Sequence, residues 1–165
     1  MSADVHLIVG KLCVGKTRYA RELVQALGGI MLSCDELMLS MFPHGLGAQH
    51  DEYALRARKY LYGRAMDVAR AGICPVLDFG FWRRDERMQL REYFRDAGLE
   101  TRWHYVTASE HDFMLNVQER NAQVSAGSAM AYIIDEGLLR KQDAVFEAPT
   151  PDEIDLYHVS RRYDA

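Results

Sequence analysis

Residues 10–17 read GKLCVGKT and match the pattern GxxxxGK[ST] in full. This pattern is typical of a loop that wraps the phosphates of a nucleoside triphosphate, because glycines let successive backbone N–H groups turn inward around phosphate oxygens. Lys16 would add a positive charge at the outer phosphates, and the Thr17 hydroxyl would bind Mg²⁺. The helix expected to begin here directs the positive end of its dipole at the same anion.

The sequence on either side supplies the context that a phosphate loop requires. An apolar run at residues 5–9 predicts a buried strand before the loop, and residues 19–27 have helical periodicity after it. We therefore predict that ATP binds here, against the alternative of a glycine-rich turn without a ligand. The predicted nucleotide-binding residues of the loop are Gly10, Lys11, Leu12, Cys13, Val14, Gly15, Lys16 and Thr17. Cys13 is either a reactive thiol or, as we favour, a small filler residue.

Composition narrows the class of protein. A chain of 165 residues, 48% of them apolar, suits a single domain over residues 1–165 with one core. Three cysteines without a CxxC pair indicate a reducing, cytoplasmic setting, and no apolar run approaches membrane-spanning length. A net charge of −4 argues against a protein that binds mainly by neutralising nucleic-acid phosphates, although a local basic groove stays open. We expect a monomer or a homodimer.

Strand and helix signals alternate along the rest of the chain. Further strands are expected at residues 30–32, 73–78, 101–107 and 154–159, and helices at residues 16–27, 35–41, 51–71, 84–97, 109–121 and 131–146. Connections long enough for crossovers predict a parallel sheet that is covered on both faces. The expected fold is therefore α/β, a three-layer α/β/α sandwich with a five-stranded parallel sheet. It would be a P-loop, kinase-like fold with a small lid at about residues 122–147.

Two acids follow the ends of predicted strands, where open parallel sheets place their ligands. Asp35 is suited to take the proton of an acceptor hydroxyl as a γ-phosphoryl group moves, and the alternative is a helix N-cap. Asp78 ends an apolar run, which is typical of an acid that helps to hold Mg²⁺, and the alternative is a simple strand-end cap. The letters DFG at residues 78–80 also occur in protein kinases, but this chain lacks the HRD loop of that family.

Arginines supply two further candidates. From Arg83 to Arg95 they recur every fourth residue among acids, which favours an ion-paired, solvated helix face. Within that face Arg87, nearest the strand end, has the best chance of reaching substrate. Arg120 comes just before the small, polar residues 123–130, where a mobile flap would swing it over the β- and γ-phosphates. The alternative is a surface arginine near a helix C-terminus.

Together these motifs resemble the small P-loop kinases grouped as an AAA-type ATP-binding family, which is similar to polynucleotide kinase, zeta toxins and chloramphenicol phosphotransferase. The resemblance rests on GKLCVGKT at residues 10–17, SCDE at 33–36, VLDFGFWRRDER at 76–87, ERN at 119–121 and FEAPTPDE at 146–153. It implies ATP as donor, Mg²⁺ on Thr17, Asp35 as the base, and Arg120 as a lid arginine with Asn121 beside it at the nucleotide.

One departure from that family bears on the acceptor. Polynucleotide kinases and zeta toxins commonly carry a substrate-gripping arginine three residues after the base, and this chain has Met38 there. The resemblance therefore implies a more apolar acceptor pocket and a small-molecule, nucleoside or nucleotide acceptor for an ATP- and Mg²⁺-dependent phosphotransferase. The acceptor stays open among nucleosides, sugars, antibiotics and polynucleotide 5′-hydroxyls. The main alternative is an ATPase or nucleotide-dependent switch without an acceptor.

Overall fold

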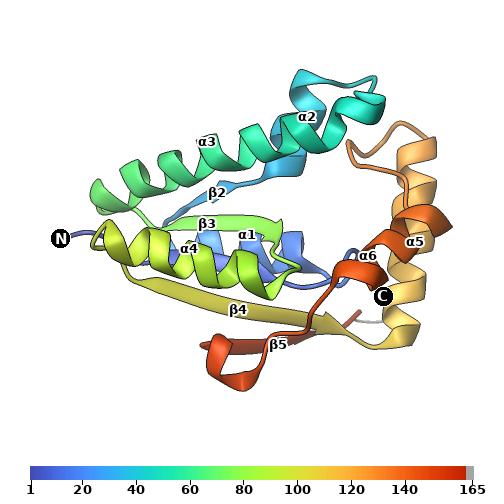
Figure 1. Ribbon diagram of the computed structural model, residues 1–165. Coiled ribbons are helices and arrows are strands. Elements are labelled where there is room, and N and C mark those ends of the chain that lie inside the picture. The colour runs from blue at the N-terminus through green and yellow to red at the C-terminus, as the bar shows by residue number, and fades with distance from the viewer. Residues whose placement is uncertain (163–165) are drawn as a thin grey trace.

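A computed structural model describes residues 1–162 and has a five-stranded, all-parallel sheet in the order β2-β3-β1-β4-β5 (Figure 1). The strands are β1 (Val5–Val9), β2 (Ile30–Leu32), β3 (Pro75–Gly80), β4 (Thr101–Ala108) and β5 (Leu156–Ser160). The predicted α/β fold with a parallel sheet is confirmed. β3 extends beyond the predicted end at residue 78, because Gly80 pairs with Val9 and its carbonyl accepts from the Gly10 N–H at 3.0 Å.

Six α-helices lie among the described residues: α1 (Lys16–Leu27), α2 (Cys34–Met41), α3 (His50–Arg70), α4 (Arg84–Asp96), α5 (Glu110–Ser125) and α6 (Glu136–Val145). The last helix begins five residues later than predicted, because Asp135 is its N-cap and accepts from the Leu138 N–H at 2.8 Å. α5 extends past the predicted end at residue 121, so the two helices are joined by residues 126–135. Within residues 1–162, none of the helices has the length and apolar character needed to cross a membrane.

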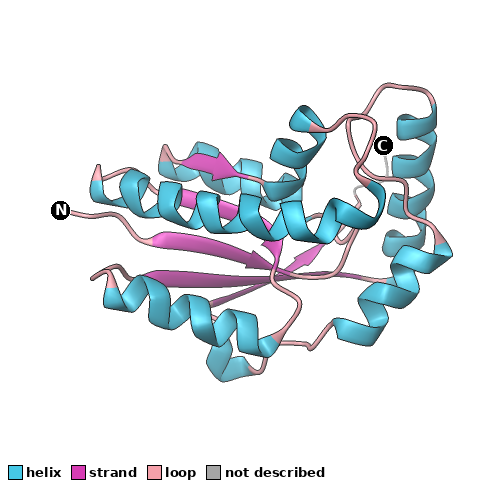
Figure 2. Ribbon diagram, turned by 45° about the horizontal axis from the view of Figure 1, so that its top comes forward, coloured by secondary structure: helices cyan, strands magenta, loops and turns pink. Residues whose placement is uncertain are grey.

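The two faces of the sheet are covered by different helices (Figure 2). On one face, α2, α3 and α4 pack against the sheet, where Met38, Leu61, Phe94 and Leu7 are buried together. On the other face, Ala20 of α1 packs against buried residues of the central strands. This arrangement is the predicted three-layer sandwich. Because all strands run the same way, their carboxyl ends meet at one edge, which is where a ligand site belongs in such a sheet.

α5 and α6 stand beyond this carboxyl edge and do not cover a sheet face as the other helices do (Figure 1). Ser109 is the N-cap of α5 and accepts from the Asp112 N–H at 3.1 Å, in line with the capping motif in the sequence. The two helices and residues 126–135 between them therefore form a wall opposite the strand ends. That wall contains the stretch predicted to be a lid.

Candidate active site

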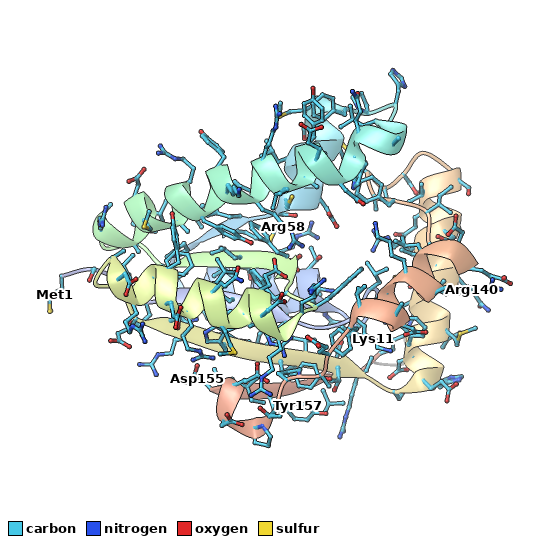
Figure 3. All side chains as sticks on the ribbon, viewed as in Figure 1. Met1, Lys11, Arg58, Arg140, Asp155 and Tyr157 are labelled. Atoms are coloured by element: carbon cyan, nitrogen blue, oxygen red, sulfur yellow. The ribbon has the colours of Figure 1, made fainter. Side chains whose placement is uncertain are left out.

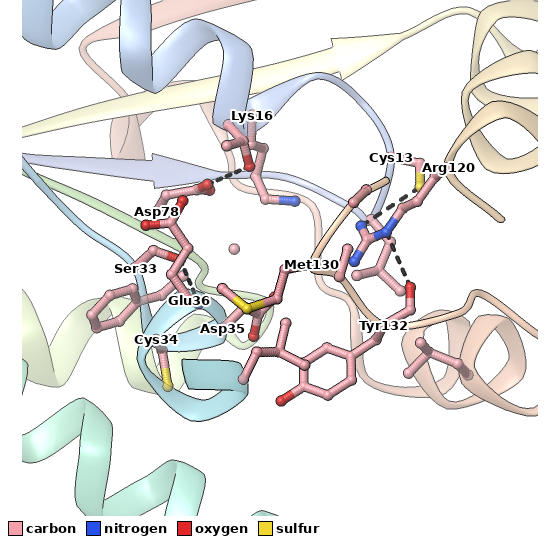
Figure 4. A pocket seen from close by; sticks show the side chains of 18 of the residues that line it. Cys13, Lys16, Ser33, Cys34, Asp35, Glu36, Asp78, Arg120, Met130 and Tyr132 are labelled. Carbon is pink, nitrogen blue, oxygen red and sulfur yellow. Dashed lines mark hydrogen bonds between the residues drawn. The ribbon is translucent and has the colours of Figure 1, made fainter. Parts of the chain in front are cut away.

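A large pocket of about 1620 Å³ opens at the carboxyl edge of the sheet. Its lining includes Lys16 and Thr17 of the phosphate loop, Asp35 from α2, Asp78 from β3 and Arg120 from α5. Figure 4 shows Lys16, Asp35, Asp78 and Arg120 around a common space, each from a different part of the chain. Residues from four separate segments of the sequence, each singled out from its pattern, are thus brought to one site.

The phosphate loop lies between β1 and α1, as its motif requires. Gly15 is the N-cap of α1 and has φ 93°, a left-handed conformation that a side chain disfavours. A Cβ atom at this position would also clash with Ser160 Oγ at 2.4 Å, because the end of β5 lies against the loop at Gly15. A Cβ at Gly10 would meet the Val106 carbonyl oxygen at 2.5 Å. The backbone path of the loop therefore depends on glycine at both positions.

Thr17 and Asp78 form the candidate metal site. The Thr17 hydroxyl donates to Asp78 Oδ2 at 2.6 Å, which places the two predicted Mg²⁺ ligands side by side. Within residues 1–162 no cluster of three or more His, Cys, Asp or Glu side chains could hold a metal by itself. The pair nevertheless fits Mg²⁺, because this ion usually binds one or two protein oxygens and completes its shell with phosphates and water.

Lys16 is half-buried and Asp35 is exposed to the pocket, and each shifts the pKa of the other. The pKa of Lys16 is lowered because burial outweighs the opposing effect of the negative charges of Asp78 and Asp35. Burial and the charge of Asp78 raise the pKa of Asp35, while Lys16 and Arg120 act in the opposite direction. A carboxylate with a raised pKa is a stronger proton acceptor, as a general base requires.

The N-cap alternative for Asp35 does not hold. Ser33 is the N-cap of α2, and its hydroxyl accepts from the Glu36 N–H at 3.3 Å. Asp35 lies in the first turn of the helix, where its charge is favourable to the helix dipole and its side chain lines the pocket. The cap and the candidate base are therefore different residues of the SCDE segment.

Arg120 faces the loop and not the outer surface (Figure 4). Its Nε donates to the Tyr132 carbonyl oxygen at 3.1 Å, and its Nη1 lies 3.8 Å from Cys13 Sγ. Both partners are uncharged groups, so the guanidinium keeps its full charge for an anion in the pocket. This geometry favours the phosphate-binding interpretation of Arg120 over the surface alternative.

The side chain of Asn121 was expected to lie beside the nucleotide, but it bonds to the backbone of Ile134. Its Nδ2 donates to the Ile134 carbonyl oxygen at 2.8 Å, and its Oδ1 accepts from the Ile134 N–H at 2.8 Å. The side chain does not line the pocket. Both polar groups of its amide bond to the backbone, so Asn121 links the segment 126–135 to α5. The prediction that Asn121 binds the nucleotide is therefore not supported by its position.

The loop side chains also divide into those that face the pocket and those that do not. Lys11 makes an ion pair with Asp143 of α6 at 2.7 Å and lies beside that helix (Figure 3). Val14 is 6% exposed and packs in the core. Gly10 accepts through its carbonyl oxygen from Trp82 Nε1 at 3.2 Å. For Lys11 and Val14, only the backbone N–H groups could bind a phosphate, whereas the Gly10 N–H already donates to the Gly80 carbonyl oxygen at 3.0 Å.

Arg87 does not reach the pocket, so its assignment to substrate binding was wrong. It is 1% exposed, and its guanidinium bonds to Glu153 through Nε at 3.1 Å and Nη2 at 3.4 Å. Its Nη1 donates to the carbonyl oxygens of Phe81, Trp82 and Glu147 at 3.0–3.3 Å. A buried charge must be paired, and here the turn at residues 150–153 brings the partner carboxylate under α4.

Two polar residues at the site were missed from the sequence. Asn116 of α5 donates through Nδ2 to the Cys13 carbonyl oxygen at 2.8 Å. Gln142 of α6 is 1% exposed, and its Oε1 accepts from the Leu12 N–H. Asn116 lies four residues before Arg120 on one helix face, a spacing that could have identified it. Nothing in the pattern around Gln142 distinguishes it from an exposed glutamine.

The phosphate loop, the strand order and the acid on the neighbouring strand define a protein of the P-loop class with a kinase-like fold. A family model described as an AAA domain matches residues 5–149. The chain belongs to this family, which confirms the resemblance inferred from its motifs. A search of curated proteins finds no match of significant similarity.

Solved structures with the same fold include several phosphotransferases. A candidate kinase from Chloroflexus aurantiacus is 17% identical, with a TM-score of 0.73 over 96% of this chain and 88% of that one. Kti12 from Chaetomium thermophilum, in complex with ADP-AlF3, is 19% identical, with a TM-score of 0.70 over 93% and 87%. APS kinase from Mycobacterium tuberculosis, in complex with AMPPNP and APS, is 18% identical, with a TM-score of 0.67 over 98% and 91%.

Proposed function

We propose that the protein is an ATP- and Mg²⁺-dependent phosphotransferase that moves the γ-phosphoryl group to a hydroxyl of a small molecule. The observation that carries the proposal is the convergence of Lys16, Asp35 and Arg120 on one pocket, beside the Thr17–Asp78 pair. A switch or a simple nucleotide-binding module needs the loop and the metal acid, but it has no use for a second carboxylate with a raised pKa in the pocket. The ATP analogue bound by the similar APS kinase also supports this assignment.

Each group would contribute through position and charge. Loop N–H groups and Lys16 hold the phosphates, and Thr17 and Asp78 hold Mg²⁺, which neutralises phosphate charge when bound. The acceptor oxygen forms a bond to the γ-phosphorus as the bond to the bridging oxygen breaks, and ADP leaves with that electron pair. The hydroxyl proton passes to the Asp35 carboxylate. Arg120 stabilises the charge on the transferring group.

A lid over residues 122–147 is part of the same proposal, as is the treatment of residues 1–162 as one domain. Side chains of α5 and α6 contact the phosphate loop, with Asn116 donating to the Cys13 carbonyl oxygen and, within the lid, Gln142 accepting from the Leu12 N–H. Such contacts could exchange for phosphate contacts when a nucleotide binds. We also place the protein in the cytoplasm, on the basis of the three free thiols of Cys13, Cys34 and Cys74.

The test uses ATP labelled in the γ-phosphate and a metabolite extract. Wild-type protein should transfer label to an organic product, and Lys16→Ala and Asp35→Asn should each abolish transfer. Asp35→Asn should still bind an ATP analogue, because its role is in proton transfer. Asp85→Asn, an exposed acid paired with Arg83 outside the pocket, is the matched control. If Asp35→Asn transfers label normally, Asp35 is not the base, and release of inorganic phosphate alone would favour the ATPase alternative.

A further inference from the structure

Beyond Asp35 the pocket has an apolar wall. Leu55 of α3 and Met130 and Ile133 of the connecting segment line the same pocket as Asp35. They are 54%, 61% and 53% exposed, so these large apolar side chains have no protein partner that covers them. Figure 4 shows Met130 and Tyr132 across the hollow from Asp78. Exposed apolar side chains gathered inside a pocket are typical of a ligand site.

This wall is held in place by contacts on two sides. Arg120 Nε donates to the Tyr132 carbonyl oxygen at 3.1 Å, and Asn121 bonds twice to the backbone of Ile134. The ring of Tyr132 meets that of His50 edge-on, with the ring centroids 5.4 Å apart. The segment therefore presents Met130 and Ile133 from a fixed backbone and is tied directly to Arg120.

Some of the cations that line the pocket already have carboxylate partners. They include Arg21 with Glu36 at 3.5 Å, Arg58 with Glu86, and Lys141 with Asp51 at 3.1 Å. Asp35 adds a further negative group. On the loop side, by contrast, Lys16 and Arg120 donate to carbonyl and thiol groups and can meet an anion. An acceptor with a carboxylate, phosphate or sulfate group would compete with these carboxylates for their cations and would face the charge of Asp35.

We propose that the acceptor is an alcohol without an anionic group, whose apolar body packs on Leu55, Met130 and Ile133 while its hydroxyl meets Asp35. This inference rests on the proposed function and adds the chemical class of the acceptor. The pocket, at about 1620 Å³, has room for both substrates, since a cavity for one small ligand is usually about 300–1,000 Å³. An uncharged acceptor with an apolar body would pack on Leu55, Met130 and Ile133 and would not be repelled by the charge of Asp35.

The test divides a metabolite extract before the reaction. Anion exchange removes acidic compounds, and reversed-phase chromatography divides the unbound material into a retained, apolar fraction and an unretained fraction that contains sugars and polyols. Each fraction is incubated with the protein and γ-labelled ATP. Label should enter a product of the retained neutral fraction. Label only from the acidic or the unretained fraction would overturn the inference and leave the phosphotransferase proposal standing, whereas no transfer from any fraction would overturn both.

Paired variants then test the wall itself. Met130→Gln removes an apolar contact and keeps the side-chain length, whereas Met88→Gln makes the same change at a 55% exposed position outside the pocket. With the retained fraction at limiting dilution, Met130→Gln should incorporate label roughly tenfold more slowly, and Met88→Gln should match wild type. Both should bind an ATP analogue as wild type does, which shows that they are folded. Equal rates for the two variants would contradict the assignment of the wall.

Discussion

Replacing Arg87 by alanine should destabilise the fold and leave the chemistry intact. The change removes two bonds to Glu153 and three to backbone carbonyl groups, and it leaves a carboxylate that is 8% exposed without its counter-ion. Burial raises the pKa of Glu153, but hydrogen bonds from Arg87 and Thr150 outweigh it and hold the pKa below its usual value. Breaking one partner of a buried pair costs about 3–5 kcal/mol.

The assay is thermal unfolding at pH 7, with label transfer measured well below the midpoint. In a chain of this size about 4 kcal/mol corresponds to a decrease in Tm of roughly 8–16 °C. Arg95→Ala is the control, because Arg95 lies on the same helix but is 69% exposed and paired only with Asp96. Its Tm should change by roughly 1–2 °C at most. An unchanged Tm for Arg87→Ala together with lost transfer would refute the reasoning and return Arg87 to the substrate site.

Three further predictions concern His104, Asp35 and Arg120. Burial, with the charge of His6, lowers the pKa of His104 to about 4. Between pH 6.5 and pH 4 only the unfolded chain binds this proton, so the free energy of unfolding should fall by roughly 3 kcal/mol as the pH is lowered across this range. Urea denaturation measures this change, and a free energy of unfolding that does not vary with pH would contradict the lowered pKa. Because its pKa is raised, ionised Asp35 destabilises the fold as pH rises through that pKa. Asp35→Asn should therefore raise the Tm at pH 7 but not at pH 3, and a lower Tm at pH 7 would contradict the raised pKa. Arg120→Ala should lower kcat by about 10²-fold or more with little change in ATP-analogue affinity, and an unchanged kcat would remove Arg120 from the mechanism.

Local patterns were enough to predict the sheet and the loop. β1 and β3 are buried at every position and mostly apolar, because both faces of a parallel sheet are covered, and the sequence revealed them for that reason. Asp35 and Asp78 could be placed together because parallel strands bring their carboxyl ends to one edge. Periodicity, strand order and loop chemistry each act over a few residues, so the sequence displays them directly.

The positions of Arg87, Asn121 and Gln142 were not predicted, because each depends on a contact with another segment of the chain. Arg87 resembles its neighbours on an exposed, charged helix face, and only the turn that carries Glu153, 66 residues later, makes it a buried residue. Asn121 adjoins Arg120 in sequence, but its amide turns to Ile134. Gln142 binds a loop N–H from 130 residues away. Helical spacing alone cannot tell which polar side chain meets such a partner.

The most direct test of the central claim is a crystal structure with AMPPNP and Mg²⁺ bound. We predict that the γ-phosphate lies between Lys16 and the Asp35 carboxylate, with Mg²⁺ held near Thr17 and Asp78 and the Arg120 guanidinium turned to the phosphates. A nucleotide bound elsewhere, or a γ-phosphate from which Asp35 is turned away, would contradict the proposed phosphotransferase.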